Sequence, residues 1–253
     1  MGETYLKALG LHADWGATAE ALQHAKQMAV DPPDPYSHIS VYNDPSGACV
    51  GLIDTRDGFS TETFTVHGAG GHTVEAWQVM PGTAEINLLD DDGELITRFL
   101  AFVDDPHMYP WYPLKAVAGL ARYSDYQLGA IAVDVNVYDS VEAWKAEQEP
   151  LNDAGMRIGP TFIASPWLFA LYAGDATAEE ASPVSMFKAV VKHVNVVTNR
   201  LTGVQWYRAL ADCGFECALA LPMDTTPAPR VGSVVDGKAF LTGTTGFWGS
   251  AVQ

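Results

Sequence analysis

Apolar and polar residues alternate over two long parts of the chain, from residue 37 to 103 and from 128 to 138. Alternation with a period of two is typical of strands that bury one face. It is strictest over Ile131, Val133, Val135 and Val137. Turn-forming residues such as 43–47 (Asn-Asp-Pro-Ser-Gly) and Asp57-Gly58 separate the predicted strands. The pattern therefore predicts a β-rich protein.

Helices are predicted before and between these strands. Residues 17–30 are rich in helix-forming Ala, Glu, Gln, Lys and Met, and the run ends at Asp31-Pro32-Pro33. We expect further helices over 114–123 and over 141–149, the second capped by Ser140. The segment 72–80 fits either a short helix or a strand. Strands and helices that do not alternate regularly predict the α+β class.

The last quarter of the chain is predicted to form a small barrel. Strands are expected over 186–198, 204–211, 216–221 and 238–245, with a Gly-x-Val-Val-x-Gly turn at 232–237 before the last one. The long first strand, the turn spacing and this glycine turn resemble the OB-fold, a five-stranded Greek-key barrel, over about residues 184–248. The segment 198–203 (Thr-Asn-Arg-Leu-Thr-Gly) is similar to proteins of actinobacterial type outside any characterised family, which implies no activity.

Charge changes abruptly near residue 184. Residues 1–183 hold 8 Lys and Arg against 27 Asp and Glu, a net charge of −19, whereas residues 184–253 hold 6 against 4, a net charge of +2. We interpret the change as a boundary between an acidic α+β domain, 1–183, and an OB-like barrel domain, 184–253. The alternative is a short segment that happens to carry few acids.

Composition narrows the class of protein further. A chain of 253 residues with 48% hydrophobic residues is long enough to bury a large core. No apolar run reaches the roughly 18 to 20 residues that span a bilayer, so we expect no membrane association. The first residues do not have the pattern of a signal peptide, so we expect none, and three cysteines are few for a secreted disulfide framework. These features predict a cytoplasmic protein.

A first chemical candidate is the pair His67 and His72 in the sequence His-Gly-Ala-Gly-Gly-His. Two imidazoles joined by a flexible loop are suited to sharing a metal ion, with His107 or the acids at 90–92 as further ligands. On this hypothesis the chain is a metal-dependent hydrolase. The alternative is a glycine-rich turn whose histidines bond to solvent or backbone.

A second candidate is the face of the predicted barrel. Lys188 and Lys192 share one strand face, and Trp206 and Arg208 share another. Basic and aromatic side chains together are typical of barrels that bind single-stranded nucleic acid. The alternative is that the aromatic residues fill the core and the lysines are ordinary surface charges.

The remaining motifs point away from catalysis. No Gly-x-Ser-x-Gly, P-loop, dinucleotide fingerprint or Cys-x-x-Cys occurs, so we predict no catalytic residue and no cofactor. The leading hypothesis is a non-enzymatic binding or scaffold protein. It would bind a protein or a small polar ligand through the barrel or the aromatic loop 106–113.

Overall fold

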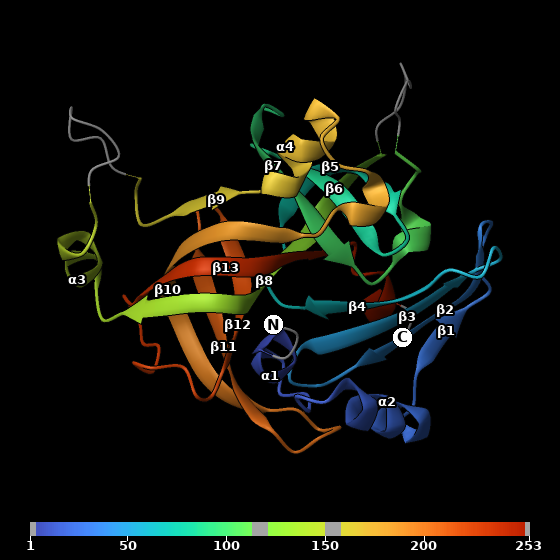
Figure 1. Ribbon diagram of the computed structural model, residues 1–253, viewed down its shortest axis with the longest axis horizontal. Helices are drawn as coiled ribbons and strands as arrows, with labels where there is room; N and C mark the ends of the chain where they lie inside the picture. Colours follow the sequence, from blue (N-terminus) through green and yellow to red (C-terminus); the bar gives the residue numbers. More distant parts are fainter. Residues whose placement is uncertain (1–3, 113–120, 150–157, 251–253) are drawn as a thin grey trace.

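Residues 4–112, 121–149 and 158–250 are described by the computed structural model (Figure 1). Its strands are β1 (Met28–Val30), β2 (Tyr36–Asn43), β3 (Ala48–Thr55), β4 (Ser60–Val66), β5 (His72–Met80), β6 (Thr83–Leu89), β7 (Leu95–Val103), β8 (Ala121–Tyr138), β9 (Phe162–Ala164), β10 (Val184–Thr198), β11 (Gln205–Asp212), β12 (Glu216–Pro222) and β13 (Val234–Thr244). Its helices are α1 (Thr4–Ala8), α2 (Trp15–His24), α3 (Val141–Ala146), α4 (Pro166–Ala173) and α5 (Phe247–Ser250), with 3-10 turns η1 (Pro106–Met108) and η2 (Ala178–Glu180). The predicted β-rich α+β class is confirmed.

Two predicted helices differ from the observed elements. The helix predicted over 17–30 corresponds to α2, which begins after Asp14 and ends at His24; the Asp14 carboxylate accepts a bond from the Gly16 amide. Its predicted last residues instead form β1, because Met28–Val30 pair with β2. Of the predicted helix over 114–123, residues 114–120 lie outside the described residues, and 121–123 begin β8. The ambiguous segment 72–80 is the strand β5.

A four-stranded antiparallel sheet is formed by the first strands, in the order β1-β2-β3-β4. Tight turns join β2 to β3 and β3 to β4, and Gly47 and Gly58 hold the positive φ angles of 99° and 91° that these turns require. We call this the small sheet.

The other nine strands form one large sheet that closes on itself twice. One ring runs β10-β11-β12-β8-β13 and back to β10, and a second runs β5-β6-β7-β13-β8 and back to β5. The long strands β8 and β13 belong to both rings and pair antiparallel from Gln127 to Tyr138. The predicted boundary between residues 183 and 184 therefore falls inside one sheet, since β8 pairs with β12 and β13.

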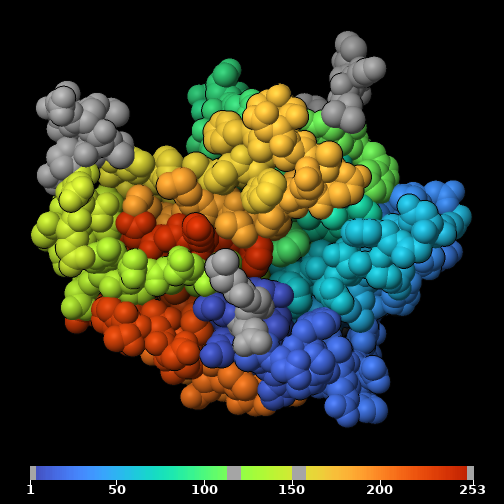
Figure 2. Space-filling view, viewed as in Figure 1, coloured from blue at the N-terminus to red at the C-terminus, as the bar shows by residue number. Residues whose placement is uncertain are grey.

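Three apolar clusters hold these layers together. The largest lies inside the two rings, around Phe99, Tyr126 and Phe187. A second joins α1 and the small sheet to the outside of the first ring through Phe64 and Trp206. Figure 2 shows the resulting contact of the N-terminal residues with the segment near residues 200–225. The third covers the other face of the small sheet with Trp248 of α5.

Among residues 4–112, 121–149 and 158–250, no helix is long and apolar enough to cross a membrane.

Candidate metal centre

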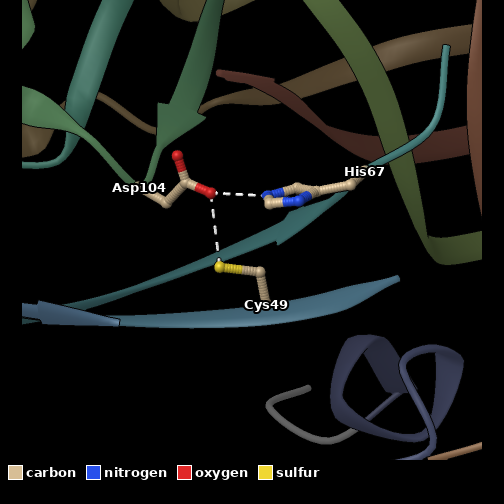
Figure 3. A group of neighbouring side chains, drawn as sticks. All are labelled: Cys49, His67 and Asp104. Carbon is tan, nitrogen blue, oxygen red and sulfur yellow. Dashed lines mark hydrogen bonds and ion pairs between the residues drawn. The ribbon is translucent and has the colours of Figure 1, made fainter. Parts of the chain in front are cut away.

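Three side chains that can bind a metal meet where the small sheet contacts the large sheet (Figure 3). Cys49 lies on β3 directly opposite Thr65 of β4, so both side chains point from the same face. His67 is two residues beyond Thr65 and shares that face by strand parity. Asp104 follows β7 of the large sheet. We call Cys49, Thr65, His67 and Asp104 the sheet junction.

Asp104 is the centre of the sheet junction. Its Oδ2 atom accepts bonds from Thr65 Oγ1 at 3.0 Å and from Cys49 Sγ at 3.3 Å, and it lies 2.7 Å from His67 Nε2. Among the residues that the structure describes, the other carboxylate oxygen, Oδ1, is buried with no hydrogen-bond partner. A buried polar atom without a partner costs about 1–3 kcal/mol, so this oxygen is a position where a further group would be stabilising.

The aspartate and the histidine form a buried ion pair. Burial alone would lower the pKa of His67, but the hydrogen bond to Asp104 and its negative charge outweigh burial and raise it. Burial likewise opposes ionisation of Asp104, but the bond and charge of His67 hold its pKa below the usual value. Asp104 is fully buried, whereas the His67 side chain is 24% exposed. The junction therefore favours a carboxylate beside an imidazolium.

Cys49 is not arranged as a nucleophile. Its thiol donates to the Asp104 carboxylate rather than to the His67 ring. Burial, followed by the charge of Asp104, raises the pKa of Cys49 well above its usual value. A nucleophilic cysteine needs a lowered pKa and access to substrate, and Cys49 is completely buried. The Cys-His-Asp set is therefore not a cysteine-hydrolase triad.

The same three groups suit a transition-metal ion. Sulfur, imidazole nitrogen and carboxylate oxygen are the ligands of zinc, at about 2.0–2.3 Å from the ion, which places ligand atoms roughly 3.2–3.8 Å apart. Here the three ligand atoms lie within 4.8 Å of one another. In the described part of the chain, no other group of three His, Cys, Asp or Glu side chains converges in this way.

A second buried carboxylate lies next to the junction. Asp105 accepts bonds from the Tyr109 hydroxyl at 3.0 Å and from the amide and hydroxyl of Thr245 at 2.9 and 2.6 Å. Burial, with the charge of Asp104 added, raises the pKa of Asp105 to about 7. The nearby His107 is packed on Phe247, and its buried ring nitrogens have no hydrogen-bond partner among the described residues. Burial lowers the pKa of His107.

His67 and His72, the predicted metal pair, have different surroundings. His67 belongs to the sheet junction, whereas His72 starts β5 and its Nε2 lies 2.7 Å from the backbone carbonyl of Glu216. The His72 ring also packs edge-on against Phe215. The residues that join His67 at the junction are therefore Cys49 and Asp104, and His72 is not one of them.

Two of the four residues predicted to bind nucleic acid are engaged inside the protein. Lys188 pairs with Asp236, and the two side chains are only 12% and 18% exposed. Lys188 also lies over the ring of Trp144. Trp206 is fully buried, and its indole nitrogen donates to Ser46. Trp206 therefore has no free ring face on which a base could stack.

The other two residues of that set remain near the surface. Lys192 pairs with Asp212 at 3.3 Å, and its side chain is exposed. Arg208 is half-buried and donates from Nη2 to the His67 carbonyl at 2.8 Å. The structure therefore brings Arg208 next to His67. Arg208 lies opposite Asn195 of β10, seven residues along that strand from Lys188.

The aromatic loop 106–113 is divided between core and surface over its described part, 106–112. Tyr109 is buried and bonds to the Tyr126 hydroxyl at 2.8 Å. Trp111 is 42% exposed and stacks on Tyr36. Met108 is also exposed. The accessible part of the loop is therefore a small apolar surface at Met108 and Trp111.

Sequence reasoning missed Cys49 and Asp104. Strand parity and the hairpin that joins β3 and β4 together place Cys49, Thr65 and His67 on one face, and this signal was available in the sequence. Asp104 comes from another sheet, so nothing local in the sequence relates it to the hairpin.

Comparison with known proteins gives little that bears on this site. No protein-family model matches the chain, and no solved structure matches it. A 64-residue stretch is 45% identical to urease subunit alpha of Yersinia pestis (strain Pestoides F) and of Yersinia pseudotuberculosis serotype O:3 (strain YPIII). The match covers 24% of this chain, and the chain spans only 11% of the length of those proteins.

Proposed function

We propose that this chain is a cytoplasmic binding protein without catalytic activity, and that one ligand is a divalent transition-metal ion of the zinc class. The observation that carries the proposal is the convergence of Cys49, His67 and Asp104 around a buried carboxylate oxygen that has no hydrogen-bond partner in the described part of the chain. An ion bound by both oxygens of Asp104 together with the sulfur and the imidazole nitrogen would have the four donor atoms that zinc prefers.

Such an ion would join the two sheets. Cys49 and His67 belong to the small sheet and its edge, and Asp104 to the end of β7 in the large sheet. A metal bound only by the folded arrangement stabilises that arrangement. Because Cys49 and Asp104 are fully buried, a substrate could not reach the ion without rearrangement. This supports a structural or storage role over the alternative of a metal-dependent hydrolase.

The OB-like character of the barrel is part of the same proposal. Support comes from the first ring, in which five strands close in the order β10-β11-β12-β8-β13. Four of them come from the segment predicted to resemble the OB-fold, and β8 completes the ring. The barrel surface and the exposed part of the 106–113 loop would make contacts to a partner. The short urease match is too small a part of that enzyme to support urease activity here.

Metal content tests the proposal directly. The full-length chain, purified under reducing conditions, would be analysed by elemental analysis, then stripped with a chelator and titrated with zinc. We expect one zinc per chain and a melting temperature that rises on zinc addition. Cobalt in place of zinc should show the absorption of a thiolate–cobalt bond.

The Cys49→Ser variant separates a metal site from a hydrogen-bonded ion pair. Serine keeps a donor to Asp104 but is a poor zinc ligand, so the metal-free protein should stay folded. Zinc affinity should fall by more than the about 10- to 100-fold typical of losing an outer-shell partner. Cys217→Ser, a buried cysteine elsewhere, is the matched control. Equal zinc response in the native chain and Cys49→Ser would contradict the proposal.

A further inference from the structure

Arg208 differs from the other basic residues in its surroundings. Among the lysines and arginines that the structure describes, only Lys188 and Arg208 are not exposed. Lys188 is paired with Asp236, but no ion pair in the described residues includes Arg208. This chain has 31 acidic residues against 14 basic ones. A half-buried guanidinium without a carboxylate partner is therefore a position left open to an external anion.

The guanidinium is held in place by its neighbours on one side. Its Nη2 donates to the His67 carbonyl, and the chain there passes so close that a Cβ on Gly68 would lie 2.2 Å from Nη2. Gly47 is similarly close, with a Cβ position 3.0 Å from Arg208 Cζ. Glycine at both positions lets the guanidinium lie flat against the two loops. Arginine has five N–H donors, so donors remain on the side away from these loops.

Arg208 lines a cleft. The cleft has a volume of about 170 Å³ and is lined by Gly68, His193, Asn195, Val197, Arg208, Ala209, Leu210 and Ala218. Asn195 of β10 lies directly opposite Arg208 of β11, and His193 is two residues from Asn195 on the same face. An amide, an imidazole and a guanidinium therefore meet in one small space. The other side chains that line it are small or apolar.

We propose that this cleft, the Arg208 cleft, binds a small molecule through an oxyanion, either a carboxylate or a phosphate group. The Arg208 fork would hold two oxygens side by side, the geometry in which guanidinium groups bind such anions. Asn195 and His193 would donate further bonds, and Val197 and Leu210 would contact the apolar part of the ligand. The volume suits a small molecule rather than a polymer, and binding here requires no metal at the sheet junction.

The experiment measures anion binding by the full-length chain at constant ionic strength. The probes are inorganic phosphate, butyrate and, as a polymer, a single-stranded oligothymidylate, each compared with chloride in thermal melts and calorimetry. We expect phosphate or butyrate to raise the melting temperature in a saturable way, and which of them does so identifies the anion. Oligothymidylate binding with no response to either small anion would overturn the proposal in favour of a nucleic-acid site.

Three variants locate the binding. Arg208→Gln should weaken the responding anion about 10- to 100-fold, as expected for loss of a charge-assisted bond. Asn195→Ala should weaken binding of the same anion by a smaller factor. Because the Asn195 side chain is exposed, this variant should fold, and it tests the site should Arg208→Gln fold poorly. Arg200→Gln removes an exposed charge from the same barrel and should change nothing. The site would be refuted if Arg208→Gln and Asn195→Ala both bound the anion as tightly as the native chain does. It would also be refuted if the native chain showed no saturable response to either anion.

Discussion

The sheet junction includes His67 and the Arg208 cleft includes the next residue, Gly68, so the two sites are neighbours along the chain. They differ in whether their charged groups have partners within the protein. At the junction, the Asp104 carboxylate is buried and surrounded by Thr65, His67 and Cys49. In the cleft, Arg208 donates to a backbone carbonyl and lines a space that is open to a ligand. A charge with internal partners contributes to the stability of the fold, whereas a charge without them is available to a ligand.

Removing the junction carboxylate should therefore have the largest effect on stability. Asp104→Ala would leave the His67 imidazolium and the Thr65 hydroxyl without their partner. Loss of one member of a buried ion pair typically costs about 3–5 kcal/mol. Chemical denaturation in the presence of a chelator would measure the effect on the metal-free protein. Asp91→Ala, at an exposed turn, is the control. If the free energy of unfolding fell by less than about 1 kcal/mol, water would be replacing the carboxylate. The ion pair at the junction would then contribute no more to stability than a pair at the protein surface.

Lys188 and Arg208 test the same contrast within the barrel. Lys188→Met leaves Asp236 with only the Trp144 indole as a side-chain donor among the bonds described. We expect a loss of about 1–3 kcal/mol in the free energy of unfolding. Arg208→Met removes a charge that has no carboxylate partner among the described residues, so its cost should be roughly 1 kcal/mol or less. Equal losses in the two variants, measured by urea denaturation, would remove the distinction between them.

Glu85 is a buried acid outside both sites and gives a smaller, pH-dependent effect. Burial raises its pKa, which the bond from Tyr172 at 2.7 Å only partly offsets. The folded state thus holds this proton more tightly than the unfolded chain. The resulting stabilisation is complete below the unfolded pKa and is lost as pH rises through the folded pKa.

Glu85→Gln should therefore stabilise the protein at pH 7, by an amount on the order of 1 kcal/mol. The gain should shrink toward zero as the pH falls below about 4, where the glutamate is neutral in both states. Thermal melts across this pH range would measure it, with the exposed Glu94→Gln as a control of equal charge change. A gain independent of pH would show that the carboxylate charge is not its cause.

Local patterns predicted most strands, because each depends on residues close together in the sequence. The alternation at 131–137 lies in β8, and the segments predicted at the carboxyl end lie in β10 to β13. The closing pairs could not be predicted, since Ala218 of β12 pairs with Gly129 of β8 across about ninety residues. The helix expected to continue to residue 30 ends at His24 instead, because Met28–Val30 pair with residues 39–41 of the next strand, β2.

The candidate sites show the same limit. Parity placed Trp206 and Arg208 on one strand face, and the structure agrees. The N-terminal segment then covers one end of that face, since a Cβ on Gly10 would lie 2.5 Å from the Trp206 ring. Trp206 is buried for this reason, while Arg208 stays at the edge of a cleft. Only the folded chain distinguishes two residues that look equivalent in the sequence.

The sharing of β8 and β13 by both rings has a consequence for synthesis on the ribosome. Neither ring can close before residues 234–244 of β13 have emerged from the ribosome, because β13 is one of the strands of both rings. Until then β7 and β10 present unpaired edges, and such edges favour association between chains. The two rings should therefore close together and late. Nascent chains that stop before residue 234 should be protease-sensitive and bound by chaperones, whereas chains in which residue 250 has cleared the exit tunnel should not.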